Sequence, residues 1–305
     1  MTSRTAGGTV RPVGADGLLL VVAIAAVSTS GPLIAAAAAV PALAIAFWRN
    51  ALAGAVLVPA ALLTRRHELR GLDRREGRLA VLAGALLALH FATWTPALGL
   101  TTVASATALV STQPVWAALL ATLRGEPVSR RVWTGIAVAM GGAVLLTGAD
   151  LRVSGAALLG DLLAVLGGMS AAAYMTAGSE IRRSVSTTTY TALCYSLTAL
   201  LLLAGCLAFR QQLGGYAAAD WVKLLALTGG AQLLGHSLFN VVLRDLSPTT
   251  VSLTLLLEIP GAALLAAVFL GQRPSLLTLP GAALLVVGIA LVIRAGGGGA
   301  SIPVE

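Results

Sequence analysis

The chain has 305 residues, of which 57% are hydrophobic and only 10% are charged. A soluble domain of average composition carries about 25% charged residues, so the composition excludes an ordinary soluble protein and indicates one that crosses the bilayer many times. The net charge of +8 does not point to nucleic acid as a partner, because the basic residues lie in short loops between apolar runs.

Ten apolar runs predict ten transmembrane helices, since each approaches the roughly 20 residues needed to cross the hydrocarbon core. Helices are expected because a chain in lipid must satisfy its own backbone polar groups. The runs lie at 17–38, 42–63, 79–99, 102–123, 131–148, 156–177, 187–208, 221–243, 250–271 and 276–294. They imply an all-α polytopic fold with a tail at each end, 1–16 and 295–305.

The basic residues predict the orientation of these helices. An even number of spans places both termini on one side of the membrane. If that side is the cytoplasm, the outer segments hold only Arg152, Arg210, Lys223 and Arg273, and nearly all other basic residues lie inside. Because short cytoplasmic loops are rich in Lys and Arg, we expect a plasma-membrane protein with both termini in the cytoplasm.

The first two spans contain a predicted kink and a charge. Pro32 removes a helix hydrogen bond, and the hydroxyls at 28–30 can satisfy the freed carbonyls. Arg49 lies about eight residues into the second span, roughly 12 Å below the outer surface. A charged side chain at such depth is rare and marks a functional site.

The third and sixth spans each carry polar and aromatic side chains on one face. His90 and Trp94 share one face of the third span, and Trp94 lies too deep for an interfacial aromatic belt. An indole offers an apolar wall and one donor, which suits an amphipathic ligand, although a packed core aromatic would look the same. Ser170 and Tyr174 form a short polar face on the sixth span that can line the same cavity.

The eighth and ninth spans hold the remaining candidates. Gln232, His236, Asn240 and Arg244 recur every four residues and predict one polar stripe. This stripe lines either a substrate path or a set of interhelical hydrogen bonds. Glu258 lies at a depth similar to that of Arg49. The two either form a structural ion pair or bind a substrate carboxylate and a proton or amine respectively.

The two halves of the chain match at a fixed offset of 146 residues. The match pairs His90 with His236 and Leu100 with Leu246, and it also aligns Pro114 with Pro260, Gly125 with Gly271, Gly135 with Gly281 and Gly142 with Gly288. Five spans in each half, 17–149 and 155–294, require the copies to insert in opposite directions, as in transporters with a central site. We assign the matched prolines and glycines to the scaffold, and function to the mismatches, Trp94 against Asn240 and Thr112 against Glu258.

Four segments resemble the EamA-type members of the drug/metabolite transporter superfamily. They read VPALAIAFWRN (40–50), HFATWTPALGLTTVASATALVSTQPVW (90–116), RGEPVSRRVWTGIAVAMGGAVLL (124–146) and GHSLFNVVLRDLSPTTVSLTLLLEIPGAALLAAVFLGQRPS (235–275). The resemblance implies ten helices in the inner membrane and transport of small organic metabolites, often amino acids and often outward. The chain departs from the family pattern at Glu258-Ile259-Pro260 and at Gly271-Gln272, which weakens any transfer of substrate from other members.

The residues and the resemblance together predict a secondary transporter for a small metabolite, with protons as a candidate coupling ion. We expect no cofactor and no enzymatic activity, because the chain contains neither a GxxxxGK[ST] loop nor an HExxH motif. The expected substrate-binding residues are Arg49, His90, Trp94, Tyr174, His236, Asn240 and Glu258. The alternatives are an uncoupled uniporter and, from another class, a channel or sensor. The sequence leaves open whether the chain acts alone or as a homodimer.

Overall fold

The computed structural model describes the chain except for residues 1–14, 102–105, 107–108, 148–154, 271–277 and 297–305. Most of the predicted tails, together with Arg152, Gly271, Gln272 and Arg273, therefore lie outside the described residues. All regular structure in the described part is helical. The longer helices are α1 (Ala15–Ser28), α3 (Ala42–Thr64), α5 (Arg74–Leu100), α8 (Arg130–Thr147), α9 (Gly155–Ile181), α10 (Thr187–Ala208) and α15 (Thr278–Gly296). The shorter ones are α2 (Ser30–Ala36), α4 (Arg66–Arg70), α7 (Gln113–Leu123), α11 (Ala218–Leu227), α12 (Ser237–Val242), α13 (Pro248–Leu255) and α14 (Glu258–Leu270).

Five helical segments of the described chain are long and apolar enough to cross a membrane. They are Asp16–Ile34, Ala42–Thr64, Arg74–Leu100, Gly155–Ile181 and Thr187–Ala208, and they match the first, second, third, sixth and seventh predicted spans. The bounds of α10 are those predicted, whereas α5 begins at Arg74 instead of 79, because Asp73 and Glu76 form a capping box at its start. The fifth and tenth predicted spans are the uninterrupted helices α8 and α15, and the fourth, eighth and ninth contain interruptions or a change of helix type.

The interruptions correct the expectation of continuous spans. The first span breaks at Thr29 between α1 and α2, and the ninth breaks at 256–257 between α13 and α14. In the fourth span, α7 starts at Gln113 after a turn at 111–112. The eighth span is continuous but changes type, since a π-helix, η1 (Thr228–His236), joins α11 to α12.

Proline explains the position of each break. Pro32, Pro114 and Pro260 all lie within the first three residues of the helix that follows, where a missing N–H costs nothing. Side-chain hydroxyls take up carbonyls that the breaks release: Thr29 Oγ1 donates to the Ala26 carbonyl at 2.6 Å and Thr112 Oγ1 to the Leu109 carbonyl at 2.6 Å. Thr29 keeps helical backbone angles within the segment Asp16–Ile34, so the interruption there agrees with the kink predicted near Pro32. The paired prolines Pro114 and Pro260 interrupt the scaffold to which we assigned them.

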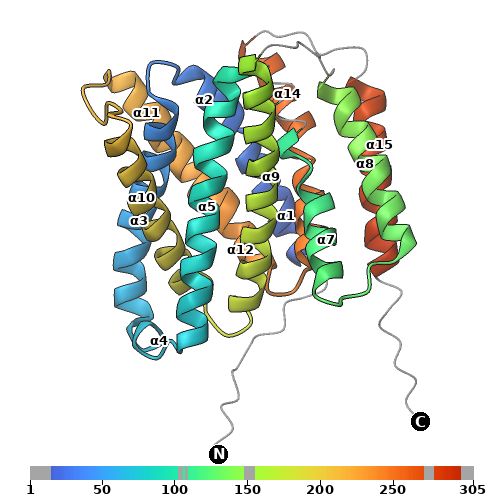
Figure 1. Ribbon diagram of the computed structural model, residues 1–305, viewed down its shortest axis with the longest axis horizontal. Helices are drawn as coiled ribbons and strands as arrows, with labels where there is room; N and C mark the ends of the chain where they lie inside the picture. Colours follow the sequence, from blue (N-terminus) through green and yellow to red (C-terminus); the bar gives the residue numbers. More distant parts are fainter. Residues whose placement is uncertain (1–14, 102–105, 107–108, 148–154, 271–277, 297–305) are drawn as a thin grey trace, which may run out of the picture.

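Pairs of helices with equivalent positions in the two repeats pack together (Figure 1). α3 packs against α10 on one side of the bundle and α8 against α15 on the other, with α5, α9, α1, α12 and α7 between them. Leu158, Leu200 and Val222 face outward, while the interior is rich in alanine. Apolar side chains outside and small residues between helices are typical of a protein that packs in lipid.

The contact between α8 and α15 shows that equivalent helices run antiparallel. A Cβ at Gly135 would lie 2.8 Å from the Gly288 carbonyl oxygen, and one at Gly142 would lie 2.6 Å from that of Gly281. Gly281 is the repeat counterpart of Gly135, and Gly288 is that of Gly142. Gly135 therefore contacts the counterpart of Gly142, and Gly142 contacts the counterpart of Gly135, as two oppositely oriented copies of one unit require. This close packing agrees with the assignment of these four glycines to the scaffold.

Gly142→Ala is expected to destabilise the protein, because the new methyl group has no room between the two backbones. Overpacking of this kind costs about 1–3 kcal/mol, and a lower unfolding temperature in detergent would show it. Gly141→Ala is the matched control, since a Cβ at Gly141 meets nothing within 4 Å. Equal unfolding temperatures for the two variants would contradict the tight contact.

Candidate functional site

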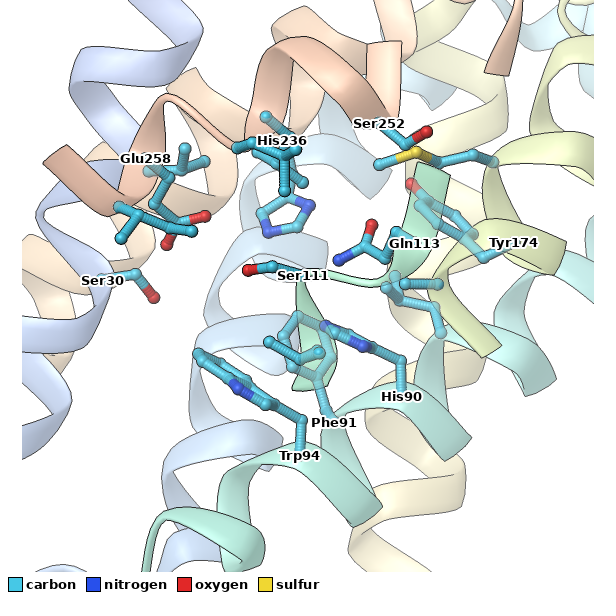
Figure 2. Close-up of a pocket in the computed structure, with 18 of the residues that line it drawn as sticks. Ser30, His90, Phe91, Trp94, Ser111, Gln113, Tyr174, His236, Ser252 and Glu258 are labelled. Carbon is cyan, nitrogen blue, oxygen red and sulfur yellow. The ribbon is translucent and has the colours of Figure 1, made fainter. Parts of the chain in front are cut away.

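A cavity of about 70 Å³ lies at the centre of the bundle, where the helix breaks meet. Figure 2 shows that its labelled side chains converge from different elements, with Trp94 and His90 on one side and His236 opposite them. The polar and aromatic residues that line it are Ser30, Arg49, His90, Phe91, Trp94, Ser111, Gln113, Tyr174, His236, Ser252 and Glu258. Six of the seven expected site residues are therefore brought together.

Arg49 is a buried cation with one unused donor. Its side chain is only 1% exposed. Nε donates to Gln232 Oε1 at 2.8 Å, and Cζ lies 4.4 Å from the centre of the Phe91 ring. Within the described chain, Nη2 has no hydrogen-bond partner. Because a buried charge is costly unless it is paired, this nitrogen is suited to an anionic group of a ligand.

Glu258 lines the same cavity but does not form an ion pair with Arg49. No contact within 4.0 Å joins the two side chains among the described ion pairs. Glu258 is the first residue of α14, directly after the break, where the helix dipole favours a negative charge. Thr112, its counterpart, accepts a hydrogen bond from Trp116 Nε1 at 2.9 Å within α7. The break before α14 is thus followed by a carboxyl group, whereas the equivalent position before α7 holds a hydroxyl group that is already hydrogen-bonded.

His90 and Trp94 form a stacked wall on α5. Their ring centroids are 5.8 Å apart and the planes differ by 6°. His90 Nδ1 lies 3.0 Å from the Gly167 carbonyl oxygen, so this nitrogen carries a hydrogen and the neutral ring keeps Nε2 as an acceptor. Trp94 Nε1 is buried and has no partner within the described chain. The wall offers the ligand an apolar surface and one donor.

Tyr174 lines the cavity, whereas Asn240 lies behind it. The Tyr174 hydroxyl donates to Asn240 Oδ1 at 2.9 Å, and Asn240 Nδ2 donates to the Tyr195 hydroxyl at 3.3 Å. Arg182 Nε donates to the Asn240 backbone carbonyl at 2.9 Å. Asn240 therefore fits the interhelical hydrogen-bond alternative, and it positions Tyr174.

The four residues of the predicted polar stripe on the eighth span have different environments in the structure. Gln232 is fully buried against Arg49 and Asn50, His236 points into the cavity, and Arg244 is exposed at the end of the helix. A π-helix covers Gln232 and His236, so this part of the span does not follow the α-helical period that the predicted stripe assumes. Spacing by four residues is therefore a poor guide to one face here.

Several residues that line the cavity were not among the site residues expected from the sequence. Gln113 is 7% exposed, and its Oε1 has no partner in the described chain. Figure 2 shows its side chain between His236 and His90. Ser30 and Ser111 flank two of the helix breaks. A proline in mid-span was the signal that could have found all three, since a break exposes its neighbours to the cavity.

The lining combines two unpaired donors, one unpaired acceptor, a carboxyl group and aromatic walls. Such a set can bind a small amphipathic molecule that carries both an acidic and a basic group. Among the described residues, no group of three or more His, Cys, Asp or Glu could hold a metal ion.

Comparisons with known proteins agree with this architecture. The model of the EamA-like transporter family matches residues 16–148 and 158–294. A solved structure titled "Crystal structure of protein" shares 21% sequence identity with a TM-score of 0.79, covering 94% of this chain and 99% of that chain. At this identity the likeness concerns the fold alone. No curated protein matches the chain.

Proposed function

Because the chain belongs to the EamA-like transporter family, we propose that it is a secondary transporter for a small metabolite with a carboxylate and an amine. Membership of this family identifies the chain as a multi-pass membrane transport protein. The proposed substrate class is inferred from the residues that line the cavity. The single observation that carries it is the buried guanidinium of Arg49, which lines the cavity and whose Nη2 has no hydrogen-bond partner among the described residues.

The other unpaired groups fit the same ligand. Trp94 Nε1 is a second donor for a carboxylate, and Gln113 Oε1 is an acceptor for an ammonium group. Glu258 supplies a negative charge across the cavity. An apolar side chain of the ligand would lie against Phe91 and the stacked rings of His90 and Trp94.

The proposed topology has ten spans, some of them interrupted, with both termini in the cytoplasm of the plasma membrane. The bundle end at α4 carries Arg65, Arg66, Arg70, Arg74, Arg75 and Arg78, together with Arg124, Arg130, Arg131, Arg182, Arg183, Arg244 and Arg294. The opposite end, at α2 and α11, carries Arg210 and Lys223 among the described residues. This asymmetry supports a cytoplasmic α4 end. Net export is proposed from the family resemblance.

Counterflow into proteoliposomes tests whether the protein is a carrier. Liposomes loaded with a candidate metabolite should take up a labelled trace of it faster than empty ones, and the rate should saturate. The candidates come from metabolites whose distribution changes in cells that overexpress or lack the protein. Flux that neither saturates nor exchanges would favour a channel instead.

A further inference from the structure

A shallow groove lies on the outer surface of α5, at the end of the bundle that carries α4 (Figure 1). The residues that line it are Arg74, Gly77, Arg78, Val81, Leu82 and Ala85. Their spacing of three and four residues places them on one face of the helix. Gly77 leaves the middle of this face open, since a Cβ there would meet nothing within 4 Å. The groove shares no residue with the central cavity.

The two arginines of the groove have no partner within the described part of the chain. The side chains of Arg74 and Arg78 are exposed, and neither takes part in an ion pair there. The acidic residues beside them, Asp73 and Glu76, are bonded to each other's backbone as the capping box of α5. Segment 65–78 holds six arginines against three acidic residues. The groove therefore offers two positive charges, one helical turn apart, to an external anion.

The length of α5 places these arginines at the level of lipid headgroups. The helix has 27 residues and is about 40 Å long, whereas the hydrocarbon core is about 30 Å thick. Its apolar run begins only at 79, so the preceding turn extends beyond the hydrocarbon. Deeper in the membrane, Val81 and Leu82 are 59% and 49% exposed, and Leu89 continues the same face. A pair of cations followed by an apolar strip matches the polarity of an anionic phospholipid.

We propose that this groove binds one anionic phospholipid of the adjoining leaflet. The lipid phosphate lies between Arg74 and Arg78, because guanidinium groups bind phosphate oxygens through paired N–H donors. Gly77 leaves room for the headgroup, and an acyl chain lies along Val81 and Leu82. Clusters of basic residues beside a transmembrane helix are typical of anionic-lipid recognition. Binding here does not require transport, so the lipid site and the proposed carrier function can fail independently.

Native mass spectrometry of the purified protein in detergent, titrated with phosphatidylglycerol or phosphatidylcholine, tests the site. The unmodified protein should retain one phosphatidylglycerol more tightly than phosphatidylcholine. Arg74→Gln/Arg78→Gln should weaken phosphatidylglycerol binding about 30-fold, because each basic side chain at an anionic lipid surface contributes roughly fivefold. Gly77→Leu keeps both charges but fills the groove, and it should also weaken binding. This change replaces a poor helix former with a good one, so it should leave α5 folded.

Arg130→Gln/Arg131→Gln is the matched control, because it removes two exposed arginines from the start of another helix, α8. It should leave phosphatidylglycerol binding unchanged. Equal affinity for the two lipids, equal losses in the two double variants, or unchanged binding by Gly77→Leu would overturn the site. Displacement of the lipid by inorganic phosphate would overturn it too, since the acyl chain would then contribute nothing. Selective lipid binding without counterflow would refute the carrier function alone.

Discussion

Arg49→Gln is expected to reduce substrate flux by about 100-fold, because a charge-assisted contact to a substrate carboxylate contributes about 3 kcal/mol. The variant keeps a polar side chain but loses the cation over Phe91 and the unused Nη2 donor. Arg49→Lys should restore little of the flux, because a single ammonium group cannot bond to Gln232, Ser30 and a ligand in the geometry of the guanidinium fork. Initial rates of counterflow at limiting substrate measure the effect.

Two controls separate binding from a structural role of Arg49. Gln232→Leu breaks the 2.8 Å bond to Arg49 but leaves the charge in the cavity. It should therefore cost less flux than Arg49→Gln. Arg210→Gln changes an exposed arginine outside the helices and should have no effect. Equal losses in Arg49→Gln and Gln232→Leu would assign Arg49 to the scaffold.

Glu258→Gln is expected to abolish the effect of a pH gradient on net flux while leaving exchange intact. A titratable group at this depth is typical of proton relays, and Glu258 faces the cavity without an ion pair to Arg49. Each coupled proton can support about a tenfold substrate gradient for one pH unit. Exchange survives in the variant because it requires no net proton movement.

The measurement compares net flux into proteoliposomes with and without an imposed pH gradient. Glu126→Gln, on the exposed loop between α7 and α8, is the control and should keep the response of the unmodified protein. An identical gradient response in Glu258→Gln and the unmodified protein would exclude Glu258 as the coupling residue. Absence of any gradient response in the unmodified protein would leave an uncoupled uniporter as the function.

The sequence predicted the features of this fold that depend on periodicity and composition. α3 and α10 begin at the predicted residues, and the matched glycines of α8 and α15 were assigned to the scaffold, although their contact with one another was not predicted. The breaks at 111–112 and 256–257 were not predicted, because apolar runs on both sides of each proline read as one span. Whether a proline kinks or breaks a helix depends on tertiary contacts that composition does not contain.

The candidate site was predicted in part for a similar reason. Arg49, His90, Trp94, His236 and Glu258 stood out because polar groups at membrane depth are rare. Gln113 did not, since its exposure to the cavity depends on the break just before it. Asn240 was placed on a stripe by assuming one continuous α-helix, whereas a π-helix precedes it and its Nδ2 donates to the Tyr195 hydroxyl. Binding of substrate by any of these residues stays a prediction until flux is measured.

The glycine contacts between α8 and α15 bear on how the two halves of the chain pair. Gly135 meets Gly288, the counterpart of Gly142, and Gly142 meets Gly281, the counterpart of Gly135. A half-length protein carrying only the first pair of glycines could make both contacts with an oppositely inserted copy of itself. The interface therefore needs no covalent link between the halves. The pairing of the halves is thus a property of the repeated unit itself, and residues around the cavity can differ between the halves without disturbing it.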